Sequence, residues 1–107
     1  MIPWFLLFMQ ESSKEIALKI IEKLNPSTIL DVPCGDGWLS NKIKNTIQID
    51  GIDLYGEEPI GYRKWGRFNL DDGLPDDFGT YDCIVSCEGI EHIGNPELFL
   101  RTAYIHL

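Results

Sequence analysis

Apolar residues in this chain form short runs that are separated by Gly, Pro, Asn and Asp, and two of the runs have helical spacing. The first of these runs follows Ser12–Glu15, which reads as a capping box at the start of a helix. This helix is expected to stop at Asn25-Pro26. In the second, Asn95 is predicted to be the N-cap and Pro96 the first helical residue of a helix that continues from Glu97 to His106. The inward residues of this second helix are expected to be Leu98, Phe99, Thr102 and Ile105.

Four shorter segments predict β-strands. The clearest is Thr28–Val32, an apolar run that suits a strand covered on both faces and that leads directly into the glycine turn Pro33–Gly37. Ile47–Leu54 predicts a second strand, residues before Phe68 a third, and Tyr81–Cys87 a fourth. The residues after the glycine turn, Trp38–Ile43, can begin a helix whose free N–H groups point back at a ligand. The chain is therefore expected to be α/β.

The glycine turn fits two ligand chemistries. A dinucleotide pyrophosphate needs the spacing G-x-G-x-x-G, but here Gly35 and Gly37 are followed by Ser40 at the third position. A nucleoside without a phosphate fits better, because Asp31 stands before the turn and would repel a pyrophosphate. Its carboxylate can instead accept hydrogen bonds from an ammonium group or from water.

The three later strand ends also carry polar residues. Asp53 lies sixteen positions beyond Gly37, where an acid can accept hydrogen bonds from both ribose hydroxyls. Asn69 follows the third strand, and its amide can accept a hydrogen bond from an amine. The fourth strand leads into the turn Ser86–Ile93.

In this order and spacing the four segments resemble class I S-adenosylmethionine-dependent methyltransferases, whose first motif is a strand-end acid followed by a loop of the form x-G-C-G-x-G. The resemblance covers about residues 14–107, and it departs from the family at Pro33, which stands where the first glycine is usual. It implies a Rossmann-like open parallel sheet with flanking helices and S-adenosyl-L-methionine as cofactor. The residues that it implies for cofactor binding are Asp31, Pro33, Cys34, Gly35, Asp36, Gly37, Asp53, Leu54, Asn69, Leu70, Ser86, Cys87 and Glu88.

The turn after the fourth strand holds Glu88, Glu91 and His92. His92 is the candidate catalytic residue, as a general base near the methyl acceptor. Two alternatives are that the three side chains ligate a divalent metal, or that His92 is structural. We expect no metal, because the same residues occur in many relatives that bind none.

At 107 residues the chain is expected to form one partial domain over 1–107, truncated after the fourth strand and its following helix. A complete class I domain has seven strands. The fourth strand should therefore be an open edge, the wall that faces the acceptor should be missing, and the chain alone should transfer little or no methyl group. The apolar segment Met1–Met9 is too short to span a membrane, and we expect it or the open edge to mediate homo-oligomer formation.

Charge and cysteine content limit the partners. Seventeen acidic residues against nine basic ones give a net charge of −8, which argues against nucleic acid and favours a small neutral or cationic acceptor. Three cysteines, an odd number, indicate a reducing compartment, and the cytoplasm is expected.

The sequence thus predicts methyl transfer from S-adenosyl-L-methionine to an O, N or C atom of a small-molecule acceptor. One alternative is a fragment of an NAD-dependent oxidoreductase. The other is a non-catalytic module that binds a cofactor or a protein.

Overall fold

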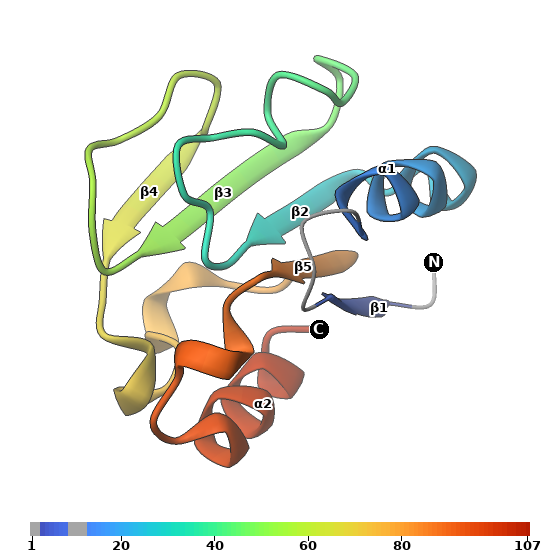
Figure 1. Cartoon of the computed structure of the whole chain (residues 1–107). Helices are drawn as coiled ribbons and strands as arrows, with labels where there is room; N and C mark the ends of the chain where they lie inside the picture. The colour runs from blue at the N-terminus through green and yellow to red at the C-terminus, as the bar shows by residue number, and fades with distance from the viewer. Residues whose placement is uncertain (1–2, 9–12) are drawn as a thin grey trace.

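A computed structural model describes residues 3–8 and 13–107 and shows an α/β fold built on one parallel sheet (Figure 1). The sheet has five strands in the order β1-β5-β2-β3-β4. The strands are β1 (Trp4–Phe8), β2 (Thr28–Asp31), β3 (Gln48–Asp53), β4 (Lys64–Arg67) and β5 (Cys83–Cys87). The helices are α1 (Ser13–Leu24) and α2 (Pro96–Ile105), and three 3₁₀ turns are η1 (Leu70–Asp72), η2 (Asp76–Phe78) and η3 (Ile90–His92).

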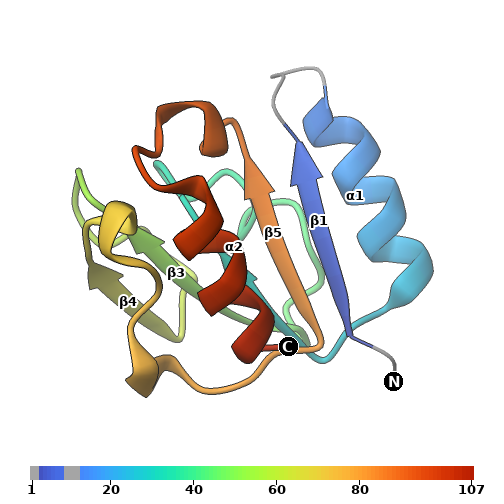
Figure 2. The same cartoon turned by 90° about the horizontal axis from the view of Figure 1, so that it is seen from below.

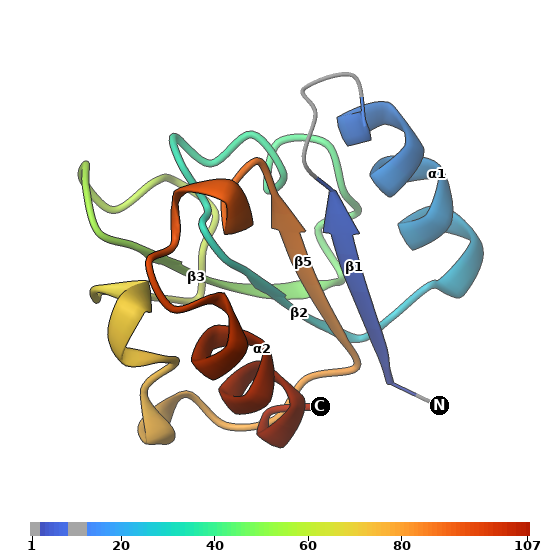
Figure 3. The same ribbon diagram turned by 60° about the horizontal axis from the view of Figure 1, so that its bottom comes forward.

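The two helices cover opposite faces of the sheet (Figures 2 and 3). On one face, Ala17 and Ile21 of α1 pack in a core with Ile29 of β2. On the other face, Phe99 of α2 packs in a second core with Leu30 of β2. Successive residues of a strand point to opposite faces, so β2 is buried on both sides, as its uninterrupted apolar run predicts. The expected Rossmann-like open parallel sheet with flanking helices is confirmed.

The N-terminal strand β1 corrects the expectation of four strands and an open edge at the last of them. Residues 4–8 pair in parallel with 83–87, so β5 lies inside the sheet between β1 and β2. The pairing is supported on both faces, because Leu6 is buried in the core under α1 and the ring of Phe5 meets that of Phe99 edge-on at 6.4 Å. Residues 1–2 and 9 of the apolar segment Met1–Met9 lie outside the described part of the chain.

The segment after the glycine turn, Trp38–Ile43, does not form the predicted helix and consists of turns. Its conformation is fixed by contacts with the loop before β4, since the Ser40 hydroxyl lies 2.9 Å from the carbonyl oxygen of Ile60 and 3.0 Å from that of Gly37. A serine whose hydroxyl bonds to backbone carbonyls competes with helical hydrogen bonding. The segment also has little room, because β3 begins at Gln48.

Both longer helices confirm the helical spacing read from the sequence. The Asn95 side chain accepts a hydrogen bond from the Leu98 N–H at 3.2 Å, so Asn95 is the N-cap of α2 as predicted. Ile105, however, is 71% exposed, and the buried positions of α2 are Phe99 and Ala103, four residues apart. The expected capping residue Ser12 of α1 lies outside the described residues.

An ion pair between a buried carboxylate and a half-exposed arginine holds β3 to the segments around it. Asp50 of β3 is fully buried and accepts hydrogen bonds from Nε and Nη2 of Arg63, at 3.0 and 2.7 Å, and from the Tyr81 hydroxyl at 2.6 Å. These bonds fix the strand whose far end carries Asp53. No helix within residues 3–8 and 13–107 is long and apolar enough to cross a membrane.

Candidate functional site

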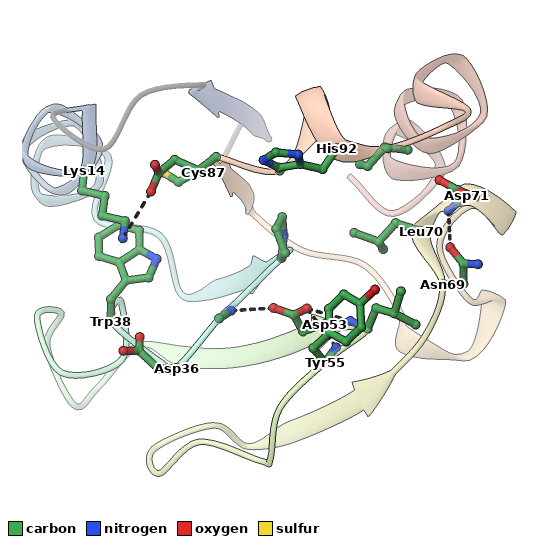
Figure 4. A pocket seen from close by; sticks show the side chains of 16 residues that line it. Lys14, Asp36, Trp38, Asp53, Tyr55, Asn69, Leu70, Asp71, Cys87 and His92 are labelled. Atoms are coloured by element: carbon green, nitrogen blue, oxygen red, sulfur yellow. Dashed lines mark hydrogen bonds and ion pairs between the residues drawn. The ribbon is translucent and has the colours of Figure 1, made fainter.

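A cavity of about 670 Å³ opens at the edge of the sheet where the parallel strands end (Figure 4). This is the edge at which open α/β sheets bind ligands. Its walls come from the glycine turn after β2, the end of β3, the turn η1, the residues after β5, and the first turn of α1. Ten of the predicted site residues line it, namely Pro33, Gly35, Asp36, Asp53, Leu54, Asn69, Leu70, Cys87, Glu88 and His92.

The two glycines of the turn have different surroundings. Gly35 has φ +56°, and a Cβ built on it would meet no atom within 4 Å, so the backbone forms an open cradle beside the cavity. Gly37 has φ +91°, and its Cβ would lie 2.5 Å from Cβ of Pro59. Gly37 is therefore needed for packing beneath the turn, and it does not line the cavity.

Asp53 is the acid at the end of β3. Its Oδ2 accepts a hydrogen bond from the Gly35 N–H at 2.8 Å, and its Oδ1 accepts from the N–H groups of Leu54 and Tyr55 at 2.7 and 3.2 Å. The carboxylate thus joins the end of β3 to the glycine cradle. Because each carboxylate oxygen has two lone pairs, Oδ2 retains a place for a ligand hydroxyl.

Asp31, which was predicted to contact the ligand, lies beneath the turn and not in the cavity wall. Its Oδ2 accepts a hydrogen bond from the Tyr62 hydroxyl at 2.5 Å, and its Oδ1 has no partner among the described residues. Burial, opposed in part by the Tyr62 hydrogen bond, raises the pKa of Asp31 from 3.8 to about 7. Sequence reasoning could not place Tyr62 here, since it comes from the loop thirty-one residues later.

Cys34 and Ser86 were also predicted to bind the ligand, and neither lines the cavity. Cys34 is buried among the residues below the turn, and burial raises the pKa of its thiol to about 12. Such a thiol stays protonated and is no nucleophile at neutral pH. Ser86 is fully buried in β5, and its hydroxyl has no partner within the described part of the chain.

The residues after β4 form a second wall. The Asn69 side chain accepts a hydrogen bond from the Asp71 N–H at 3.0 Å, which caps η1 and turns Leu70 toward the interior. Asp71 is the second residue of η1. Its carboxylate accepts a hydrogen bond from the Gly94 N–H at 2.6 Å, so it ties η1 to the loop before α2, and it lines the cavity.

The turn after β5 approaches the glycine turn closely. A Cβ on Gly89 would lie 2.3 Å from Cδ of Pro33, so these two residues pack directly together. Glu88 has φ +56°, a left-handed conformation that non-glycine residues seldom adopt and that is concentrated at functional sites. His92 lines the cavity with a side chain that is 80% exposed. In the part of the chain that the structure describes, no three His, Cys, Asp or Glu side chains are grouped to hold a metal ion.

Six further residues line the cavity and were not predicted as site residues: Lys14, Trp38, Tyr55, Asp71, Gly89 and Ile93. Tyr55 is 76% exposed at the rim, directly after the strand-end residues Asp53 and Leu54, and this position was the one available signal for it. Lys14 reaches the cavity because α1 packs against β1 and β5. That contact depends on the strand pairing that the sequence did not reveal.

The fold and the site define an α/β domain with a ligand cavity at the ends of its parallel strands. Comparison with known proteins identifies the family: a family model described as "Methyltransferase domain" matches residues 6–107, and the chain belongs to this family. The ubiquinone biosynthesis O-methyltransferases of Vibrio parahaemolyticus serotype O3:K6 (strain RIMD 2210633) and Vibrio campbellii (strain ATCC BAA-1116) are each 27% identical to it over 86 residues. The match covers 69% of this chain and 36% of each relative, so the chain spans little more than a third of their length. No solved structure matches the chain significantly.

Proposed function

We propose that this chain is the cofactor-binding part of a methyltransferase that takes S-adenosyl-L-methionine in the cavity and serves a small-molecule acceptor. The observation that carries the proposal is the open cradle at Gly35 held beside the Asp53 carboxylate. Membership of the methyltransferase family and the similarity to two O-methyltransferases support it.

The residues present fit this cofactor. The cradle at Gly35 lets a ligand approach the backbone, and Asp53 Oδ2 would accept a ribose hydroxyl. Asn69 and Leu70 lie on the wall where the resemblance puts the adenine. The volume of about 670 Å³ is within the range of small-molecule pockets.

When bound, S-adenosyl-L-methionine supplies an activated methyl group on a sulfonium ion. This chain's own contribution is to bind and orient the reactants and to exclude water from them. Carboxylates of Asp36, Asp53, Asp71 and Glu88 line the cavity, and their negative charge favours a cationic ligand. His92, at the exposed side of the cavity, is proposed to accept the proton of the acceptor nucleophile.

The structure does not favour the alternative of a nicotinamide dinucleotide. Such a ligand places its pyrophosphate at the N-terminus of a helix that follows the glycine turn. Here residues 38–43 form turns, so no helix end points at the cavity from that position. Methyl transfer by the chain to a small acceptor would exclude the remaining alternative, a non-catalytic binding module.

Calorimetric titration with S-adenosylhomocysteine, and separately with NAD, tests the proposal. We expect S-adenosylhomocysteine to bind, and Asp53→Ala to weaken it by about 1.5–3 kcal/mol because a charge-assisted hydrogen bond is lost. Asp76→Ala removes an exposed carboxylate in η2 that does not line the cavity, and this control should bind like the wild type. Binding of NAD without binding of S-adenosylhomocysteine would show that the proposal is wrong.

A further inference from the structure

A second cavity, of about 310 Å³, lies between α1 and the turns that precede β3. Among the described residues, none that lines it also lines the cavity at the strand ends. Its volume is at the lower end of the range for small-molecule pockets, so a ligand for it must be small. The residues that line it are Leu18, Ile21, Glu22, Asn25, Lys42, Ile43, Lys44 and Ile47.

One part of the wall of the second cavity is apolar. Ile21 of α1 and Ile47 before β3 are 2% and 9% exposed and belong to the core under α1. Leu18 and Ile43 are half-buried and pack against the same core. Residues 38–47 cover this side of the core with turns and bends in place of a helix, and a hollow remains between them and α1. An apolar group that enters the hollow removes these side chains from water, which favours its binding.

The other part of the wall is positively charged. Lys42 and Lys44 are exposed on either side of Ile43, and neither ammonium forms an ion pair or a hydrogen bond with the part of the chain that the structure describes. Glu22 of α1 supplies a single carboxylate among the described lining residues, so the lining has a net positive charge. The chain as a whole has a net charge of −8. The second cavity therefore attracts an anion although the molecule as a whole repels one.

We propose that the second cavity binds a small amphipathic anion, a carboxylate at the end of a short aliphatic chain. The aliphatic chain packs against Leu18, Ile43 and Ile47, and the carboxylate pairs with the two unpaired lysines. The Glu22 carboxylate repels the ligand's charged end from α1 and so directs it to the lysines. A neutral chain of the same length would leave both lysines unpaired, and a purely polar anion would leave the apolar wall in contact with water. The site is separate from the cavity assigned to the cofactor, and the proposal does not depend on methyl transfer.

Titration of the isotopically labelled chain with octanoate, followed by two-dimensional NMR, tests the proposal. Saturable shifts are expected at the backbone amides of residues 18–25 and 42–47. The neutral 1-octanol has the same length, and it should bind about 5-fold more weakly or worse because it pairs with neither lysine. Butyrate keeps the charge on a shorter chain, and it should bind about 10-fold more weakly or worse because it buries less apolar surface.

Two double variants test the role of the charge. Lys42→Met combined with Lys44→Met should weaken octanoate by about 5-fold or more and change the affinity for 1-octanol by less than about 2-fold. Lys19→Met combined with Lys23→Met removes two exposed lysines of α1 that do not line the second cavity. This control loses the same number of positive charges and should bind octanoate like the wild type.

A larger side chain in the hollow tests the apolar contacts. Leu18→Phe should weaken octanoate and 1-octanol alike, because the ring occupies space that the aliphatic chain needs. The proposal is overturned if octanoate does not bind, if 1-octanol binds as well as octanoate, or if both double variants lose the same affinity. Shifts confined to the residues around the strand ends would also overturn it. If S-adenosylhomocysteine fails to bind, the proposed function fails while this assignment stands.

Discussion

At the scale of single residues, Gly35 and Gly37 are two positions apart and are required for different reasons. Gly35→Ala should reduce the free energy of unfolding by only about 1–2 kcal/mol, the usual cost of a left-handed residue, while it removes ligand binding because the methyl group enters the cradle. Gly37→Ala should cost more, because its Cβ would also meet Pro59 at 2.5 Å. Urea unfolding of both variants gives the comparison, and equal losses would contradict this account of the turn.

Asp31 is expected to make the stability of the fold depend on pH. Burial raises its pKa to about 7, so the folded protein holds the proton more tightly than the unfolded chain does. The stabilisation that the protonated Asp31 side chain gives the folded state is fully present below about pH 4 and is lost as the pH rises through about 7. Over this range the free energy of unfolding falls by no more than about 1.4 kcal/mol per pH unit. Relative to the wild type, Asp31→Asn should therefore become progressively more stable from pH 5 to pH 7, with no further change above.

The partner of Asp31 provides the control. The Tyr62 hydroxyl hydrogen bond favours the ionised carboxylate, so Tyr62→Phe should shift the pH dependence to higher pH without abolishing it. Thermal unfolding of the wild type, Asp31→Asn and Tyr62→Phe at four pH values measures how the stability of each depends on pH. A stability difference between Asp31→Asn and the wild type that does not vary with pH would contradict the assignment.

At the scale of elements, β1 can be tested as a member of the cooperative fold. Leu6 is 7% exposed and packs in the core under α1, so Leu6→Ala should lower the free energy of unfolding by about 2–5 kcal/mol. Trp4 is on the same strand but 47% exposed, and Trp4→Ala should cost less. Urea denaturation measures both values. If Leu6→Ala leaves the free energy of unfolding unchanged, β1 is not part of the cooperative fold.

The elements that the sequence predicted are those whose signals are local. The strand at Thr28–Asp31 and the helix that begins at Pro96 follow from apolar runs, caps and turn residues that are adjacent in the chain. The turns at residues 38–43 depend instead on Ile60 and Pro59, and β1 depends on a partner strand that begins at Cys83. A pattern along the chain carries no record of such contacts.

The residues of the candidate site also fall into those with a signal in the nearby sequence and those placed by long-range contacts. Asp53, Asn69 and Glu88 were implied by the resemblance to the methyltransferase family, and each lies at or just after the end of a parallel strand, at one edge of the sheet. Asp31 also precedes a turn, and only its contact with Tyr62 shows that it is directed beneath the cavity. Lys14 was missed because its position follows from the packing of α1 on β1 and β5.

At the scale of the whole molecule, the two edges of the sheet differ. Lys64 and Arg67 bound the edge strand β4, whereas the edge strand β1 contains no charged residue. Charged edges resist pairing with another chain, and apolar edges permit it. We therefore predict that the protein self-associates through β1, and light scattering over a series of protein concentrations measures this.

A lysine at the edge should weaken that association. Leu7 is 39% exposed, so Leu7→Lys should reduce the apparent mass at high concentration while the circular dichroism spectrum stays unchanged. Ile60→Lys, at a loop position that is 92% exposed, should leave the association as it is. A wild-type chain that remains monomeric at every concentration would show that the apolar edge strand β1 does not cause self-association.

The sheet order has a consequence for the time at which the protein can fold. The strand that comes first in the chain pairs with the strand that comes last, and the partners Trp4 and Cys83 are 79 positions apart (83 − 4). On the ribosome β1 has no partner until β5 has been synthesised, and a pairing over so long a separation forms slowly. Its apolar face must stay in solution meanwhile, so nascent chains that stall before residue 83 should be the species that chaperones retain.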